Sequence, residues 1–286
     1  MDLELTNPRA RLCQAESRTT PFSCLGEFLW YLAQSDAIDF IQYYAPKYSD
    51  HVKVIDDRVL GGYGPRLFAW DGVDQVDNVI RLLRDRPTTR QATIQIFDRH
   101  DLAPGCRDVP CTCMLQFLCR DNQLHLITNM RSNDAVRGLP HDVFAFTMLQ
   151  ELVARSISAE VGIYRHWVGS LHIYDVDLQT ARDLIAEGWQ RTVGAAMAPM
   201  PQGDPWPILR NVLVAERAFR VDRRTDPWPS VGSKYWDGLI WLLEMLRHIK
   251  GKDLARAEAA WIRRPDQHFD LFVDSRLHRL REAGPI

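Results

Sequence analysis

The segment between residues 106 and 119 concentrates side chains that can do chemistry, because four of the six cysteines of the chain fall within it: Cys106, Cys111, Cys113 and Cys119. Thiolates act as zinc ligands or as nucleophiles. Zinc knuckles need paired C-x-x-C motifs, which this segment lacks. A cysteine on a strand is also commonly a small core residue. Cys111, which follows Pro110, therefore does not by itself distinguish a nucleophile from a core residue.

Polar residues beyond Cys111 follow one another in a distinctive order. They are Arg131, Ser132 and Asp134, then Gly138 to Asp142, then His172 and Tyr174. An arginine beside a serine suits a dianionic phosphate, because guanidinium forms bidentate hydrogen bonds and the hydroxyl adds another. Taken alone, Arg131 could be a solvated charge at a strand end, and His172 and Tyr174 could simply pack against a strand. The ordered combination favours a phosphate-binding site.

This ordered set resembles the signature of the thymidylate synthases over roughly residues 9–177. In that family a Pro-Cys-His stretch followed by Gln-Phe supplies the nucleophile, and Pro110-Cys111 with Gln116-Phe117 keeps the spacing. The resemblance implies that Cys111 is the nucleophile. It implies these further roles: phosphate binding by Arg131, Ser132 and Asp134, base recognition by Gly138 and Asp142, and contact with the sugar hydroxyl by His172 and Tyr174.

Two upstream motifs extend the resemblance. Glu27 opens the stretch Glu-Phe-Leu-Trp-Tyr-Leu, which resembles the helix of the family's catalytic glutamate, and Tyr63 opens a similar Tyr-Gly pair. We expect both among the catalytic groups, although a buried structural glutamate paired with an arginine is the alternative. The resemblance also implies an N-terminal phosphate arginine, either Arg9, our choice, or Arg11. It also implies a homodimer. The family has two consecutive arginines that reach the partner's phosphate site, and Arg90 is the one that this chain keeps.

The implied chemistry explains these residue types. A pyrimidine C5 is a poor nucleophile until a thiolate adds to C6, after which C5 attacks a one-carbon electrophile. In the family 5,10-methylenetetrahydrofolate is the co-substrate that supplies it, and no metal takes part. We expect the arginines that hold the phosphate to lower the pKa of Cys111. Glu27 would organise the proton transfers.

Two departures from the synthases point to another substrate and product. Asp142 replaces their base-reading Asn, and a carboxyl that shares one proton can satisfy both N3 and the 4-amino group of cytosine. The same change marks the cytidylate hydroxymethylases. Asp108 replaces an apolar Leu that shields the one-carbon intermediate, so water can add and give a hydroxymethyl product. A simple N-cap is the alternative for Asp142.

The sequence thus resembles a folate-dependent CMP or dCMP 5-hydroxymethylase. A divergent thymidylate synthase acting on dUMP and a non-catalytic nucleotide-binding relative stay open. Thr112, His141 and Ser170 replace a His, a Phe and an Asp of the family, which leaves the roles of these three positions open. An Arg- and Ala-rich, lysine-poor composition indicates a GC-rich genome, which fits CMP in antibiotic biosynthesis as well as dCMP in a phage.

Periodicity predicts the elements that hold these residues. Helical spacing covers residues 22–44, 73–84, 143–156, 235–249 and 254–261, and strands cover 92–97, 111–119, 123–131 and part of 161–177. Residues 60–66 read as a glycine-rich loop. We expect an α+β fold with a mixed sheet flanked by helices. It would form one catalytic domain over residues 1–286, with a helical extension at 235–286 that has no counterpart in the synthases.

Composition limits the class of protein that this chain can be. Hydrophobic residues make up 46% and charged residues 25%, which is typical of a folded globular chain. A formal net charge of -2 gives no basic field for nucleic acid. The N-terminus lacks the features of a secretion signal and no stretch is apolar enough to span a membrane, so we expect a cytoplasmic protein with reduced thiols.

Overall fold

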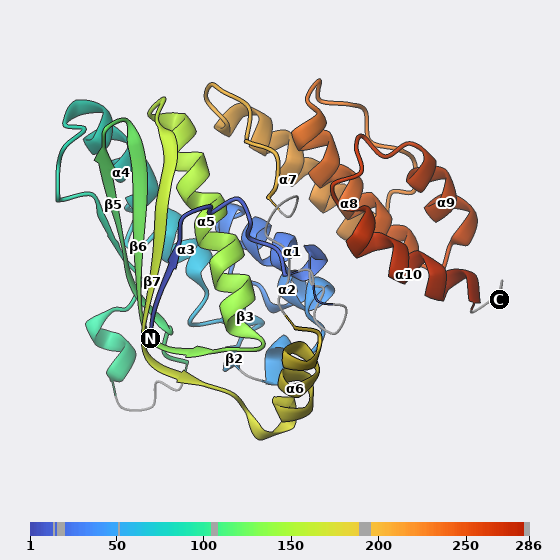
Figure 1. Cartoon of the computed structure of the whole chain (residues 1–286), viewed down its shortest axis with the longest axis horizontal. Helices are drawn as coiled ribbons and strands as arrows, with labels where there is room; N and C mark the ends of the chain where they lie inside the picture. The colour runs from blue at the N-terminus through green and yellow to red at the C-terminus, as the bar shows by residue number, and fades with distance from the viewer. Residues whose placement is uncertain (14, 16–20, 51, 104–107, 189–195, 283–286) are drawn as a thin grey trace.

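The computed structural model describes residues 1–286 except 14, 16–20, 51, 104–107, 189–195 and 283–286 (Figure 1). The strands are β1 (Asp2–Leu5), β2 (Val54–Ile55), β3 (Arg58–Val59), β4 (Thr93–Gln95), β5 (Thr112–Arg120), β6 (Gln123–Asp134) and β7 (Glu160–His172). The α-helices are α1 (Pro21–Leu32), α2 (Ile38–Tyr44), α3 (Tyr63–Phe68), α4 (Gln75–Asp85), α5 (Gly138–Ser156), α6 (Leu178–Ala186), α7 (Trp206–Arg220), α8 (Lys234–Lys250), α9 (Leu254–Ile262) and α10 (Asp270–Glu282).

A five-stranded mixed sheet in the order β1-β7-β6-β5-β4 forms one side of the molecule. Strands β5 and β6 form a hairpin closed by Asp121 and Asn122, both with positive φ. A two-residue turn of this kind suits Asp and Asn, which tolerate the left-handed region. The two strands predicted at 111–119 and 123–131 are thus joined by a tight polar turn.

Strands β6 and β7 run parallel, so the chain must cross over between them. Helix α5 makes this crossover along one face of the sheet and is buried along almost its whole length between the sheet and α1 (Figure 1). Helix α1 is also buried all round, which explains its nearly continuous apolar sequence. Its Gly26 is required for close packing, because a Cβ there would lie 2.0 Å from the Tyr44 ring of α2. Helix α1 thus packs against both α5 and α2.

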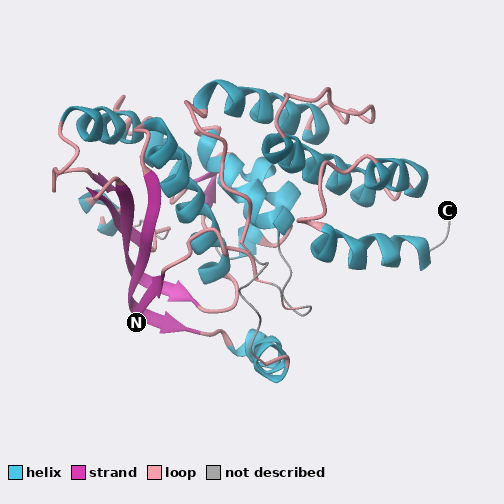
Figure 2. Cartoon of the chain, turned by 45° about the horizontal axis from the view of Figure 1, so that its top comes forward, coloured by secondary structure: helices cyan, strands magenta, loops and turns pink. Residues whose placement is uncertain are grey.

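Helices α7 to α10 lie on the far side of α1 from the sheet (Figures 1 and 2). One hydrophobic core runs through both parts, from Leu115 and Phe117 of the sheet to Trp236 and Leu243 of α8. The expected α+β fold with a mixed sheet flanked by helices is confirmed. Within the described residues, no helix is both long and apolar enough to cross a membrane.

Several local predictions need correction. Helix α5 begins at Gly138, so Asp142 lies inside the helix, and Arg137 occupies the N-cap position without a side-chain cap. The N-cap alternative for Asp142 is therefore wrong. Tyr63 opens helix α3 instead of lying in a loop. Helices α6 and α7 are not predicted from the sequence, because α7 lies between the Pro- and Trp-containing stretches 197–207 and 226–229 and no buried face marks α6.

Candidate active site

A cavity of about 1010 Å³ lies where α1, α3, α5 and the carboxyl ends of β6 and β7 meet. Its walls include all the expected site residues except Arg9 and Arg90. These wall residues are Glu27, Tyr63, Asp108, Cys111, Arg131, Ser132, Asp134, Gly138, Asp142, His172 and Tyr174. The cavity therefore gathers expected site residues that are up to 147 positions apart in sequence, from Glu27 to Tyr174.

Cys111 precedes β5 and faces Arg131 of β6. The Arg131 backbone N–H donates to the Cys111 carbonyl over 2.9 Å, and its guanidinium Nη2 lies 3.8 Å from the Cys111 Sγ. Carbonyls of Val109 and Pro110 accept from the same guanidinium at 2.7 and 2.9 Å, which holds it in place. The hairpin register thus puts a cation beside the thiol.

The expected lowering of the Cys111 pKa is not found. Burial raises the pKa of the thiol, and nearby Asp142 and Asp108 add to this, so that the lowering effect of Arg131 is outweighed. The thiol of the free protein is therefore less acidic than an ordinary cysteine. The sequence showed the neighbouring arginine but not the burial.

Glu27 of α1 forms a buried contact with His141 of α5. His141 Nδ1 lies 2.7 Å from Glu27 Oε2, and the Tyr31 hydroxyl donates to Oε1 over 2.6 Å. Burial raises the pKa of Glu27, but His141 and Tyr31 more than offset this and leave it lowered. Burial lowers the pKa of His141, but Cys24 and Glu27 outweigh it and raise that pKa well above its ordinary value. Glu27 is thus an ionised acceptor paired with a cationic His141, not with an arginine.

Asp142 lies one residue beyond His141 and is only 8% exposed. Burial, followed by the charge of Glu27, raises the pKa of Asp142 to about 7. Its Oδ2 accepts a hydrogen bond from Asn133 Nδ2 over 2.7 Å. Asn133 occupies the variable position of the Arg-Ser-x-Asp motif, so no sequence signal marked it, whereas His141 was marked only as a departure from the family.

The parallel register of β6 and β7 builds the other end of the cavity. It pairs Ser132 with Ser170 and Asp134 with His172. Ser132 Oγ lies 3.4 Å from His172 Nδ1, and the His172 and Tyr174 rings meet edge to face with centroids 5.0 Å apart. Ser132, His172 and Tyr174 thus line the same cavity as Arg131.

Asp134 accepts hydrogen bonds from the backbone that follows it. Its Oδ1 accepts the backbone N–H groups of Val136 at 3.0 Å and of Arg137. These bonds shape the turn that leads into α5, beside Gly138. Arg137 lines the cavity and pairs with Asp177 over 2.6 Å. Asp134 therefore positions the entrance of α5.

Tyr63 and Asp108 lie near Cys111. The Tyr63 hydroxyl accepts from the Thr112 backbone N–H over 3.1 Å, and its ring stacks on Phe146. Asp108 Oδ2 accepts from the Gly61 N–H over 2.6 Å, and burial raises the pKa of its carboxyl. Each side chain thus lines the cavity while one of its oxygens accepts a backbone N–H.

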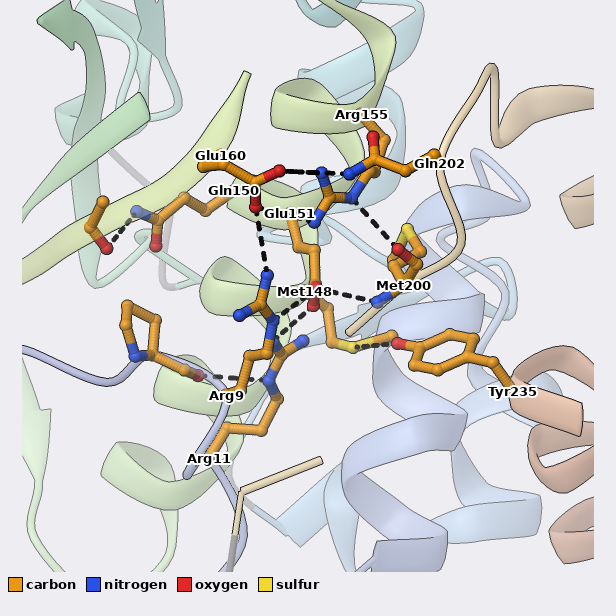
Figure 3. A network of polar contacts seen from close by, with 12 residues as sticks. Arg9, Arg11, Met148, Gln150, Glu151, Arg155, Glu160, Met200, Gln202 and Tyr235 are labelled. Atoms are coloured by element: carbon orange, nitrogen blue, oxygen red, sulfur yellow. Dashed lines mark hydrogen bonds and ion pairs between the residues drawn. The ribbon is translucent and has the colours of Figure 1, made fainter. Parts of the chain in front are cut away.

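Arg9 and Arg11 lie elsewhere (Figure 3). Glu151 of α5 is fully buried and accepts from Arg9 Nε at 2.9 Å and from Arg11 Nη2 at 2.6 Å. Neither arginine lines the cavity, so the structure gives no support for a phosphate contact by Arg9. Arg90 is exposed and outside the cavity of its own chain.

Metal ligands are not gathered in the described part of the chain, where no group of three or more His, Cys, Asp or Glu side chains could hold an ion. The described cysteines, Cys13, Cys24, Cys111, Cys113 and Cys119, take part in no disulfide. Cys106 lies outside the described residues.

A cavity that joins a cysteine, an arginine and a buried glutamate lies beside a mixed sheet with a crossover helix, an arrangement typical of an enzyme active site. The chain belongs to the thymidylate synthase family, whose profile, described as "Thymidylate synthase", matches residues 14–196. Members of this family bind a nucleoside monophosphate and methylenetetrahydrofolate.

Two relatives show how far the likeness extends. A putative thymidylate synthase of Methanosarcina mazei is 33% identical over 124 residues, which is 43% of this chain and 57% of the relative. A thymidylate synthase of Buchnera aphidicola is 29% identical over 171 residues, which is 56% of this chain and 62% of the relative. The chain thus spans about three-fifths of the length of these curated relatives.

Proposed function

We propose that the protein is a folate-dependent 5-hydroxymethyltransferase that converts CMP or dCMP, methylenetetrahydrofolate and water to the 5-hydroxymethyl nucleotide and tetrahydrofolate. The main support for this proposal is Asp142, a buried carboxyl in the cavity wall with a pKa of about 7, at the position where the family reads the base. Such a group can hold one proton near neutral pH, donate it towards cytosine N3 and accept from the 4-amino group. A permanently ionised carboxylate could not donate.

Cys111 would add to C6 of the bound base. Its raised pKa keeps the thiol protonated in the free protein, and Arg131 is the nearest cation that opposes this. A proton on N3 withdraws electrons from the ring and makes C6 a better electrophile. Attack requires the thiol to lose its proton, and Asp142, a carboxylate once it has given its own proton to N3, is the neighbouring group that can accept it.

Glu27 would accept protons in this reaction. His141 keeps it ionised, and Tyr31 orients its Oε1. An ionised carboxylate at the cavity wall suits removal of the C5 proton as a general base. Tyr63, anchored by Thr112 N–H, would orient the proton transfers beside Cys111.

The nucleotide would lie with its phosphate at Arg131 and Ser132 and its sugar at His172 and Tyr174. Arg131 and Ser132 offer the charge-assisted donors that a phosphate needs. Asp134 and Gly138 would contribute by shaping the entrance of α5. Asp108 would admit or orient the water that becomes the product hydroxyl, since its carboxyl reaches the cavity near Cys111.

The same cavity has room for the folate co-substrate, which supplies the one-carbon electrophile when bound. In addition to the polar residues named above, the cavity is lined by Tyr48, Val52, Leu102 and Lys47. Aromatic and aliphatic surface suits a pterin ring, and a lysine suits a glutamate carboxylate. These residues therefore fit the co-substrate.

A homodimer would complete the site. The sheet face opposite α5 carries half-buried apolar side chains, including Met114, Leu118 and Ile127, interspersed with polar ones, and Trp167 there is 42% exposed. Covering this surface would bury apolar area. Arg90, exposed near this sheet, is our candidate for reaching the partner's phosphate.

The test is a competition among CMP, dCMP and dUMP, each tritiated at C5, with methylenetetrahydrofolate and mass analysis of products. We expect tritium release from a cytosine nucleotide and a hydroxymethyl product, without dihydrofolate. Methylation of dUMP with dihydrofolate formation would instead support a thymidylate synthase, which the names of both relatives favour. A Cys111→Ser variant with unaltered activities would support a non-catalytic relative.

A further inference from the structure

Three buried polar residues stand in a row behind Asp142. Asn133 of β6 donates from Nδ2 to Asp142 Oδ2 over 2.7 Å. The Oδ1 of Asn133 lies 3.2 Å from His166 Nε2 of β7, and His166 Nδ1 lies 2.6 Å from the Tyr164 hydroxyl. Asn133 is 3% exposed, and His166 and Tyr164 are fully buried. The row therefore connects the base-reading carboxyl to the interior of the sheet.

The chemistry of these groups sets the direction of the hydrogen bonds. Burial lowers the pKa of His166 to about 4, so the ring is neutral at neutral pH and has one N–H. Because Asn133 presents a carbonyl oxygen to Nε2, that nitrogen carries the proton and Nδ1 accepts from Tyr164. Tyr164 thus donates to His166, His166 to Asn133, and Asn133 to Asp142.

This direction matters because a carboxylic acid can pair with either pyrimidine. With its proton on the oxygen opposite N3, the acid donates to N3 and accepts from the 4-amino group of cytosine. With the proton on the other oxygen, it donates to O4 and accepts from N3–H of uracil. Protonation of Asp142 alone therefore does not choose between the bases.

Asn133 makes the two oxygens of Asp142 different. Oδ2 already accepts an amide N–H, which favours the unprotonated, carbonyl-like state there. Oδ1 has no hydrogen-bond partner in the described part of the chain, and Asp142 lines the cavity. The proton is thus expected on Oδ1.

We propose that Asn133, held in one orientation by His166 and Tyr164, directs the proton of Asp142 to Oδ1 and thereby makes the site select cytosine over uracil. In this arrangement Oδ1 faces N3 and Oδ2 faces the 4-amino group. Asn133 and His166 are positioning residues that act through Asp142. The inference rests on the proposed function, because it requires that Asp142 reads the base.

The test compares the dissociation constants of CMP and UMP, measured by isothermal titration calorimetry at pH 6.5. Asn133→Ala removes the donor and should reduce the preference for CMP about tenfold, because the proton can then occupy either oxygen. Asn133→Asp has nearly the same shape but presents an acceptor, so it should draw the proton to Oδ2 and shift the preference further towards UMP. His166→Phe frees the amide to turn and should shift it in the same direction.

Gln150→Leu is the matched control, because it removes another buried amide of the sheet–α5 contact that donates to the Leu124 carbonyl outside the cavity. It should keep the wild-type ratio, and thermal melting should identify any variant that does not fold. A wild-type CMP preference that survives in both Asn133→Asp and His166→Phe overturns the inference alone. Wild-type protein that prefers neither CMP to UMP nor dCMP to dUMP overturns the proposed function together with the inference.

Discussion

His141 Nδ1 lies 2.7 Å from Glu27 Oε2, so the residue that departs from the family at this position is the ion-pair partner of the expected catalytic glutamate. Both side chains are buried, at 16% and 10% exposure. A buried pair keeps its charges only with good geometry and further hydrogen bonds, which Tyr31 and Ser23 supply here. The pair makes Glu27 an acceptor throughout the neutral range.

Replacing His141 tests this role of the pair. His141→Phe removes the cation but leaves Glu27 buried, so the Glu27 pKa should rise by about one to three pH units. The acidic limb of the pH profile for C5 tritium release should move to higher pH accordingly. Ser23→Ala removes the contact at the far ring nitrogen, leaves the His141–Glu27 pair in place and serves as the control. An acidic limb that stays in place in His141→Phe would argue against the pairing.

The affinity for CMP should depend on pH through Asp142, whose pKa lies at about 7. Bound cytosine needs one proton between Asp142 and N3, which the free protein already carries below pH 7. Above pH 7 a proton must be taken up, so the dissociation constant should rise by up to about tenfold per pH unit.

Calorimetry from pH 6 to 9 measures this dependence, with UMP as the control for titration of the phosphate. The other titratable groups facing Asp142 are Glu27, His141, Cys111 and the four tyrosines Tyr31, Tyr48, Tyr63 and Tyr164, whose raised pKa values keep them protonated across this range. Asp142→Asn should flatten the CMP-to-UMP affinity ratio across this range. A wild-type ratio that does not change with pH would contradict the assignment.

The reactivity of Cys111 should depend on the charge of Arg131. Arg131→Gln removes the cation that opposes the raised pKa of the thiol, so iodoacetamide alkylation at pH 7.5 should slow by roughly tenfold per unit of pKa increase. Arg131→Lys keeps the charge and should retain most of the rate. Peptide mass spectrometry separates Cys111 from half-buried Cys113, whose rate should stay the same. Equal slowing in Gln and Lys variants would indicate loop distortion instead.

The Glu151 network should contribute to stability. Glu151→Gln leaves the fully buried Arg11 without a carboxylate partner, so we expect a loss of about 3–5 kcal/mol in the free energy of unfolding by urea. Glu4→Gln breaks the exposed pair with Arg165 and should lose at most about 1 kcal/mol. Similar losses in the two variants would show that the buried network contributes little.

The sequence alone determined the order and local chemistry of the site. The resemblance carried by the ordered motifs predicted Cys111 as the nucleophile and Arg131 as a phosphate ligand, and helical periodicity predicted the C-terminal helices, because these features depend on residue types and their order along the chain. The cavity brings most of the expected residues together. Their chemical roles stay predictions.

Only the tertiary structure decided how the charges of these residues are set. The pairing of His141 with Glu27 joins two helices, and the contact of Asn133 with His166 joins two parallel strands. Burial raises the pKa of Cys111 against the neighbouring arginine. Arg9 lies with Glu151 instead of in the cavity. Desolvation and contacts between distant segments have no signature in local spacing, since both depend on how the elements pack.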